Sequence, residues 1–183
     1  MCGRFAGFRS LRELQESFPI DKAACEVTVN YNVAPSQEIL AIVKHEGENW
    51  LDKFHWGLVP FWAKDISIGN RMINARAETI AEKPSFRNAF KKRRCLILAD
   101  GFYEWKGEKG NKQPFYIFIP SGEPFAFAGL WETWNDKDDD SIYKSCTIIT
   151  TAASKSIVEL HNRMPVILNP EVYEQWLNVE LQD

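Results

Sequence analysis

The sequence predicts an α+β fold, in which a β-rich, barrel-like antiparallel or mixed sheet carries short flanking helices. Most apolar segments are short runs rich in β-branched and aromatic residues, separated by turn-forming residues, as expected of strands. Few segments combine helical periodicity with caps. The chain has 183 residues, of which 45% are hydrophobic, so it can bury a substantial core. We therefore expect one domain over residues 1–183.

The first part of the chain predicts one helix and one hairpin. Residues 10–17 (SLRELQES) begin with Ser10 and carry Glu13 three positions later, which is the pattern of a capping box. Residues 38–44 and 50–56 have the composition of strands and flank the turn-like stretch HEGEN. We expect these two strands to pair as a β-hairpin.

The remainder predicts more strands than helices. Residues 76–82 and 85–93 are expected to be helical, with an interruption at Pro84. Residues 94–100 (RCLILAD) form a compact apolar run typical of a buried strand. We expect further strands at 114–119, 125–131, 143–150 and 164–168, and helices at 154–160 and 170–178.

Composition excludes several classes of protein. The net charge of −3 gives no global basic signature, so binding to nucleic acid would need a local patch such as residues 87–94. The four cysteines form no CxxC pair and only three histidines accompany them, so we expect no metal site and no cofactor. No signal peptide and no apolar run long enough to cross a membrane is evident. A cytoplasmic protein with reduced thiols is expected.

Cys2 is the leading candidate for chemistry. Removal of Met1 would leave a residue that carries both a free α-amine and a thiol. The α-amine has a pKa far below that of lysine, and we expect the thiol to be partly ionised and nucleophilic. Such an aminothiol condenses with an aldehyde to an imine and then closes a thiazolidine ring. Gly3 permits close approach and Arg4 can hold an anion, although Cys2 could also be a small apolar residue at a chain end.

Three further polar residues are candidates, each with a structural alternative. Asn74 could hold an amine or a ligand oxygen, or could cap the helix expected after it. Glu104, which follows the expected strand at 94–100, could act as an acid or base, or could be a surface residue on a strand. His161 could carry a proton, or could be a structural residue at a corner.

An aromatic cluster surrounds Gly57 and Pro60 in the segment HWGLVPFWAKD. Trp56 is expected in the core. Trp62, in a loop beside Lys64, could instead stack on an unpaired base.

Taken together, the motifs resemble the SOS-response-associated peptidase family, also called the abasic-site processing proteins. The matching blocks occur in the family order and cover nearly the whole chain. They are MCGRF at 1–5, YNVAPSQ at 31–37, WGLVPFW at 56–62, NARAET at 74–79, FRNAFKKRRCLILADGFYEWK at 86–106, QPFYIF at 113–118, GLWETW at 129–134, TIITTAAS at 147–154 and LHNRMPVIL at 160–168.

The resemblance implies a DNA-repair protein of the SOS response that recognises abasic sites in single-stranded DNA. Cys2 matches the residue that forms a thiazolidine with the ring-opened deoxyribose and so crosslinks protein to DNA. Asn74 matches the residue that positions the amine and the sugar, Glu104 one that assists proton transfer, and His161 one that stabilises the opened sugar. Residues matching those that contact the DNA strand are Arg4, Trp62, Arg76 and Arg163.

The family name also implies peptidase activity, understood as self-removal of Met1, and a lyase-type activity is expected beside it. Nothing in the sequence requires an oligomer, so we expect a monomer, associated with the nucleoid or replication fork, where replication-fork proteins could be partners. Family members usually continue past the last helix with a segment that returns to the sheet, whereas this sequence ends at Asp183. While Met1 is attached, the nitrogen of Cys2 is acylated and cannot form an imine.

Two alternative functions stay open at this point. An N-terminal-nucleophile amidohydrolase or glutamine amidotransferase can also begin Met-Cys-Gly and use the freed cysteine. A non-catalytic single-stranded DNA binder would rely on aromatic and arginine side chains alone.

Overall fold

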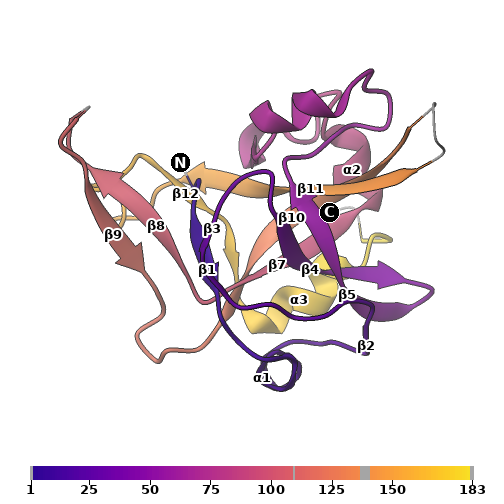
Figure 1. Ribbon diagram of the computed structural model, residues 1–183, viewed down its shortest axis with the longest axis horizontal. Coiled ribbons are helices and arrows are strands. Elements are labelled where there is room, and N and C mark those ends of the chain that lie inside the picture. Colours follow the sequence, from indigo (N-terminus) through magenta and orange to yellow (C-terminus); the bar gives the residue numbers. More distant parts are fainter. Residues whose placement is uncertain (1, 109, 137–140, 182–183) are drawn as a thin grey trace.

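The computed structural model describes residues 2–108, 110–136 and 141–181. It confirms the expected β-rich α+β fold, with two sheets and only short helices. Figure 1 shows a small sheet on the left, packed beside a larger sheet that curls around the centre of the molecule. No helix of the described residues is both long and apolar enough to cross a membrane.

The larger sheet closes into a five-stranded barrel. Its strands are β4 (Glu38–His45), β5 (Glu48–Trp56), β7 (Arg94–Ala99), β10 (Phe125–Asn135) and β11 (Ile142–Ala152). Four pairings around the ring are antiparallel, namely β5–β4, β4–β7, β7–β10 and β10–β11. The ring closes where β5 and β11 pair in parallel. The barrel is therefore mixed, and its interior is filled by large apolar side chains such as those of Phe54, Trp56, Phe127 and Ile148.

The small sheet is antiparallel, with the strand order β3-β1-β8-β9. Its strands are β1 (Phe5–Gly7), β3 (Asn30–Val33), β8 (Gly101–Lys106) and β9 (Gln113–Ile117). The ring of Phe5 lies 5.2 Å from that of Trp56 and 5.8 Å from that of Phe127. One face of the small sheet thus packs on the barrel core, which fixes the N-terminal residues at the junction of the two sheets.

Short elements cover the remaining surfaces. They are α1 (Leu11–Ser17), β2 (Lys22–Ala23), the 3-10 helix η1 (Ile66–Arg71), β6 (Asn74–Arg76), η2 (Ala77–Thr79), α2 (Arg87–Lys92), β12 (Arg163–Pro165), β13 (Ile167–Leu168), η3 (Pro170–Val172) and α3 (Tyr173–Leu177).

Most of the expected elements are confirmed. Ser10 and Glu13 form both bonds of the capping box at α1, and the hairpin of β4 and β5 is present. The strands expected at 94–100, 114–119, 125–131 and 143–150 correspond to β7, β9, β10 and β11. The helices expected at 85–93 and 170–178 are present in shortened form as α2 and as η3 with α3.

Two expected helices are wrong. At 76–82 the chain instead begins with the end of β6, which pairs in parallel with β11, and only Ala77–Thr79 forms a 3-10 turn. At 154–160 the chain makes successive turns, in which Ile157 N donates to Ser154 O. This connection must join Ala152 to its partner Arg163 in the neighbouring strand. Strand pairing at both ends outweighs the weak helical preference of so short a segment.

The strand expected at 164–168 is divided. β12 pairs with β11, whereas β13 pairs with β10. Val166 lies between them, where its N donates to Ile149 O and its O accepts from Ala128 N. The chain therefore changes partner strands at Val166 and contributes to both.

Candidate functional site

Asn74 and Cys2 are in direct contact although they are far apart in the sequence. The side-chain Nδ2 of Asn74 donates to the backbone O of Cys2 over 2.9 Å. Because that carbonyl needs a donor, the contact fixes the orientation of the amide. The other atom of the amide, Oδ1, is buried and has no hydrogen-bond partner among the described residues. The alternative role for Asn74, as a helix cap, is wrong.

Strand pairing places Asn74 in this position. β6 lies parallel to β11, with Asn74 opposite Ile148. The preceding residue, Ile73, accepts a 2.9 Å bond from the indole Nε1 of Trp56 and a 3.2 Å bond from Ile148 N. Trp56 lies in the core, as expected. The core of the barrel thus anchors the residue that contacts Cys2.

Cys2 is fully buried in the main core cluster. Burial raises the pKa of its thiol, and the nearby charge of Glu104 raises it further, while a hydrogen bond from the Arg4 backbone opposes both effects weakly. While Met1 is attached, these low-dielectric surroundings favour the neutral thiol. The partly ionised thiol expected of Cys2 after the loss of Met1 stays a prediction. Any role of Cys2 as a nucleophile needs a base to take its proton.

Glu104 is positioned by the small sheet. Tyr103 N donates to Arg4 O over 2.9 Å, which joins β8 to the segment that leads from Cys2 into β1. Glu104 is buried, so the alternative of a surface glutamate is wrong. Its carboxylate is close enough to influence the Cys2 thiol. An acid–base group therefore lies beside the candidate nucleophile.

His161 lies at the end of the turns that precede β12. Its Nδ1 accepts the backbone N–H of Arg163 over 2.9 Å. The same Nδ1 lies 3.2 Å from Arg163 O, and in the tautomer that accepts from Arg163 N the neutral imidazole carries its proton on Nε2. His161 can therefore present an N–H donor to a bound molecule.

Glu104 and His161 border a cleft of about 610 Å³, and Cys2 and Asn74 lie behind its wall next to Gly3. It is lined by Gly3, Arg4, Glu104, Trp105, Gly110, Lys112 and His161. In Figure 1 the strand β1 lies beside β8, where the two sheets meet. The structure thus brings together the candidates Cys2, Asn74, Glu104 and His161 at one end of the barrel.

Arg163 forms a salt bridge with Glu78 that was not predicted from the sequence. Its Nη1 and Nη2 donate to the two carboxylate oxygens of Glu78 over 2.6 and 3.0 Å, and Nη2 also donates to Thr150 O. This guanidinium lowers the pKa of Glu78 to about 2. A phosphate at Arg163 would have to share these donors with Glu78. The motif NARAET contains Glu78, but nothing in the sequence paired it with Arg163.

The two other candidate arginines are more accessible. Arg4 lines the cleft, and its Nη1 donates to Asn32 Oδ1 over 2.9 Å. Arg76 is exposed at the end of β6, opposite Thr150 in the pairing with β11. Both retain donors that can contact an anion, because an arginine carries five N–H groups.

Trp62 lies in an exposed loop that is held firmly at its base. Its side chain is 48% exposed, and the neighbouring Phe61 is 58% exposed. A hydrogen bond of 2.8 Å from Trp134 Nε1 to Ala63 O fixes the loop. Gly57, with φ of 138°, lies so close to the chain at Gly69 that a Cβ there would be 2.5 Å from the carbonyl oxygen. This contact requires glycine and holds η1 against the end of β5.

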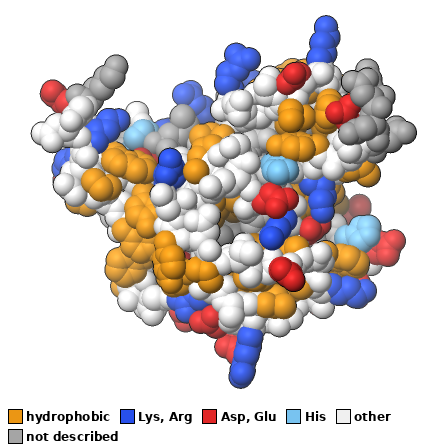
Figure 2. Space-filling view, viewed as in Figure 1, with side chains coloured by type: hydrophobic (Ala, Val, Ile, Leu, Met, Phe, Trp, Pro, Cys, Tyr) orange, Lys and Arg blue, Asp and Glu red, His pale blue; other side chains and the backbone are white. Residues whose placement is uncertain are grey.

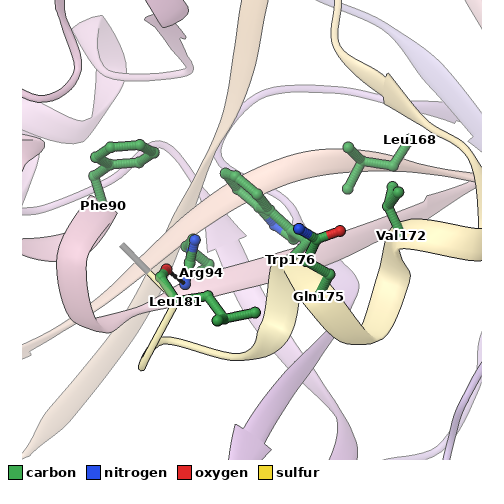
Figure 3. Close-up of a pocket in the computed structure, with 7 residues that line it drawn as sticks. All are labelled: Phe90, Arg94, Leu168, Val172, Gln175, Trp176 and Leu181. Carbon is green, nitrogen blue, oxygen red and sulfur yellow. Dashed lines mark hydrogen bonds between the residues drawn. The ribbon is translucent and has the colours of Figure 1, made fainter. Parts of the chain in front are cut away.

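A second cavity, of about 190 Å³, lies away from these residues, between α2 and α3. Figure 3 shows Arg94 and Trp176 inside it, with Arg94 Nη2 donating to Leu181 O. None of the candidate residues lines this cavity, and its walls are mainly apolar. Within the described ranges no group of three or more His, Cys, Asp or Glu side chains could hold a metal ion.

The family assignment follows from comparison with known proteins. The model of the family described as SOS response associated peptidase (SRAP) matches residues 1–183. The chain belongs to the SOS response associated peptidase family. The resemblance inferred from the motifs is thereby confirmed.

Named relatives share most of their length with this chain. The abasic site processing protein YoqW of Bacillus subtilis (strain 168) is 48% identical over 186 residues, which cover 100% of this chain and 83% of the relative. The abasic site processing protein YedK of Escherichia coli (strain K12) is 32% identical, with coverage of 99% and 81%. A crystal structure of a protein from Bacteroides thetaiotaomicron superposes with a TM-score of 0.86 at 30% identity, covering 100% of this chain and 83% of that one.

Proposed function

We propose that this chain processes abasic sites in single-stranded DNA by forming a covalent crosslink through Cys2. The contact between Asn74 and the Cys2 carbonyl carries the proposal, because it holds the second residue of the chain beside Glu104 at the end of the cleft. The names of the relatives support abasic sites as the substrate, since both are called abasic site processing proteins.

The reaction requires the α-amine of Cys2, and therefore the loss of Met1. The amine nitrogen attacks the aldehyde carbon of the ring-opened deoxyribose, the carbonyl oxygen leaves as water, and a C=N bond forms. The sulfur then adds to that carbon while the thiol proton passes to the nitrogen, which closes the thiazolidine. No oxidant or cofactor enters this balance.

The surrounding residues have roles suited to these steps. The unpartnered Oδ1 of Asn74 can accept an N–H of the freed amine, which would orient the nitrogen lone pair toward the aldehyde. Glu104 can take the proton that the amine loses and return it to the departing oxygen. The Nε2–H of His161 can donate to the oxygen of the opened sugar.

Burial of Cys2 also bears on the fate of the product. A thiol with a raised pKa stays neutral until Glu104 or another base removes its proton, which limits side reactions. A thiazolidine in this position would be shielded from water, and hydrolysis would be slow. A durable crosslink that protects the damaged strand follows.

The remaining candidates complete the proposal. Arg4 binds a backbone phosphate at the cleft, and Arg76 binds another at the exposed end of β6. Arg163 contacts a phosphate while sharing its donors with Glu78, and Trp62 stacks on a base. We include in the proposal the self-removal of Met1, a lyase-type activity, and action as a monomer in DNA repair at the replication fork.

Intact mass spectrometry tests the reaction directly. The chain without Met1 is mixed with a single-stranded oligonucleotide that carries one abasic site, and with the undamaged oligonucleotide as a control. We expect a mass increase equal to the abasic strand minus one water, stable to denaturation without a reductant. Cys2→Ala should remove the adduct. An equal adduct on Cys2→Ala, or none on the wild type after Met1 is lost, would refute the proposal.

A further inference from the structure

The outer face of the small sheet carries an unusual concentration of aromatic rings. The pairings Ala6↔Gly101 and Tyr103↔Tyr116 place these four residues on the face that points away from the barrel, because Phe5 and Phe102 occupy the opposite face. We call the set on this outer face the aromatic face. It comprises Phe8, Tyr31, Tyr103, Trp105, Tyr116 and Phe118.

The rings of the aromatic face are ordered relative to one another. Phe8 stacks on Tyr31 with centroids 5.1 Å apart and planes at 19°, and Tyr116 stacks on Phe118 at 5.6 Å and 21°. Tyr103 lies 5.0 Å from Tyr116, and its hydroxyl donates to Tyr31 O over 2.9 Å. The rings therefore form one connected surface across all four strands of the small sheet.

Two backbone features place these rings on the surface. The register shifts between Phe5↔Val33 and Gly7↔Asn30, so an irregularity in β3 turns Tyr31 to the outer face. A Cβ at Gly101 would lie 2.4 Å from the ring of Tyr116, so that ring lies flat on the strand and only glycine fits beneath it. The rings thus lie along the sheet.

The aromatic face is open to solvent. Tyr31 is 63% exposed and Phe118 is 55% exposed. Figure 2 shows hydrophobic side chains gathered on the left of the molecule, where Figure 1 draws β8 and β9. A contiguous exposed apolar surface of this kind marks a binding site, whereas single apolar residues scattered over a surface are ordinary.

The aromatic face is continuous with the cleft. Trp105 is two residues beyond Tyr103 on the same side of β8, and it lines the cleft together with Arg4. Arg4 O accepts from Tyr103 N, and Arg4 Nη1 donates to Asn32, the neighbour of Tyr31. A strand that leaves the cleft past Arg4 would therefore reach the aromatic face directly.

We infer that the aromatic face binds the unpaired bases of the DNA strand that flanks the abasic site. This inference rests on the proposed function and extends it to a second part of the site. An antiparallel sheet with flat exposed rings suits successive bases, each of which offers a π-face for stacking. The bases would stack on the rings while Arg4 holds the phosphates at the cleft.

The charges near the rings make the inference specific. Arg9 lies 5.5 Å from the centroid of Phe8, but its Nε is bound to Asp100 at 2.7 Å. The aromatic face therefore adds stacking and little positive charge. Removing a ring from the aromatic face should weaken DNA binding without changing the number of counterions released from the DNA. The salt dependence of binding should therefore stay the same.

Equilibrium binding of undamaged oligothymidylate tests the inference. Tyr31→Ala and Phe118→Ala are compared with the wild type on strands of about 4 and about 16 nucleotides, which span the range of known site sizes. On the long strand we expect binding to weaken roughly 5- to 150-fold for each variant, with an unchanged slope against salt. Both variants should bind the short strand, which is held at the cleft, nearly as tightly as the wild type does.

Controls separate this inference from the proposed function. Ile142→Ala removes an equally exposed apolar side chain from β11 and should bind both strands like the wild type. Tyr31→Phe keeps the ring and should retain binding, and thermal melting verifies that each variant folds. Wild-type affinity of both alanine variants for the long strand, or an equal loss on both strands, would overturn the inference. Crosslinking of a short abasic strand by the wild type tests the proposed function independently.

Discussion

The hydrogen bond from Asn74 to the Cys2 carbonyl gives the most direct test of how the site is organised. Asn74→Ala removes the 2.9 Å bond and leaves that carbonyl without its donor. The loss of a partner for a buried polar group costs about 1–3 kcal/mol. If the bond orients the aminothiol throughout the reaction, this corresponds to crosslinking slower by about 5- to 150-fold.

Asn74→Asp makes the test sharper because the shape is nearly unchanged. The aspartate carboxylate has no N–H, so it would place an acceptor against the acceptor oxygen of the Cys2 carbonyl. Near neutral pH the Asn74→Asp variant should therefore crosslink at least as slowly as Asn74→Ala. A carboxyl in this partly buried position should have a raised pKa. Its protonated form can donate, so the rate relative to the wild type should recover toward about pH 5.

The assay is the initial rate of adduct formation on an abasic oligonucleotide, measured by denaturing gel from pH 5 to 8. Asn169→Asp is a matched control, because Asn169 is the N-cap of η3, makes no side-chain cap bond and lies outside the cleft. Rates for Asn74→Asp equal to those of the wild type at every pH would refute the argument. Equal losses in Asn169→Asp would show that the effect is not specific to the site.

Three further predictions concern the framework of the site. Trp56→Phe loses the bond to Ile73 O, and we expect the free energy of unfolding in urea to fall by about 1 kcal/mol, with slower crosslinking. The Glu78 carboxylate has a pKa of about 2, below its ordinary 4.5, so its stabilisation is complete above pH 4.5 and is lost as the pH falls toward 2. Glu78→Gln should therefore lower the melting temperature at neutral pH and make it decline less than that of the wild type between pH 4.5 and 2. Parallel declines of the two proteins would contradict this reasoning. Gly57→Ala should destabilise the protein by roughly 1–3 kcal/mol or more in thermal melts, because φ is positive and the carbonyl of Gly69 leaves no room.

The elements predicted correctly from sequence are those with local signals. The helix α1 has its own capping box, and the hairpin of β4 and β5 has its own turn. The strands β1 and β3 were missed because each is short and irregular and is formed by pairing with a distant segment. The segment at 76–82 has local helical preference, but β11 holds its first residue in a parallel pairing.

In the candidate site, too, the residues could be predicted from sequence motifs, whereas the contacts between distant segments could not. The motifs nominated Cys2, Asn74, Glu104 and His161, and the structure brings them to one end of the barrel. The partners of the arginines were missed, because the pair formed by Glu78 and Arg163 depends on how η2 and β12 both lie against β11. Trp105 was not nominated as part of the cleft, since its position beside Arg4 follows from the pairing of the small sheet.

By itself, the sequence determined the family of the protein and nominated the residues of the candidate site. Once Met1 is removed, a cysteine at the second position carries an amine and a thiol on one residue whatever the fold, and the diagnostic blocks are likewise a property of the chain. Only the tertiary structure decided that Asn74 contacts Cys2 across 72 positions of sequence, and that the thiol is buried and its pKa raised. Proximity and local dielectric arise from the packing of distant segments, which no local pattern encodes.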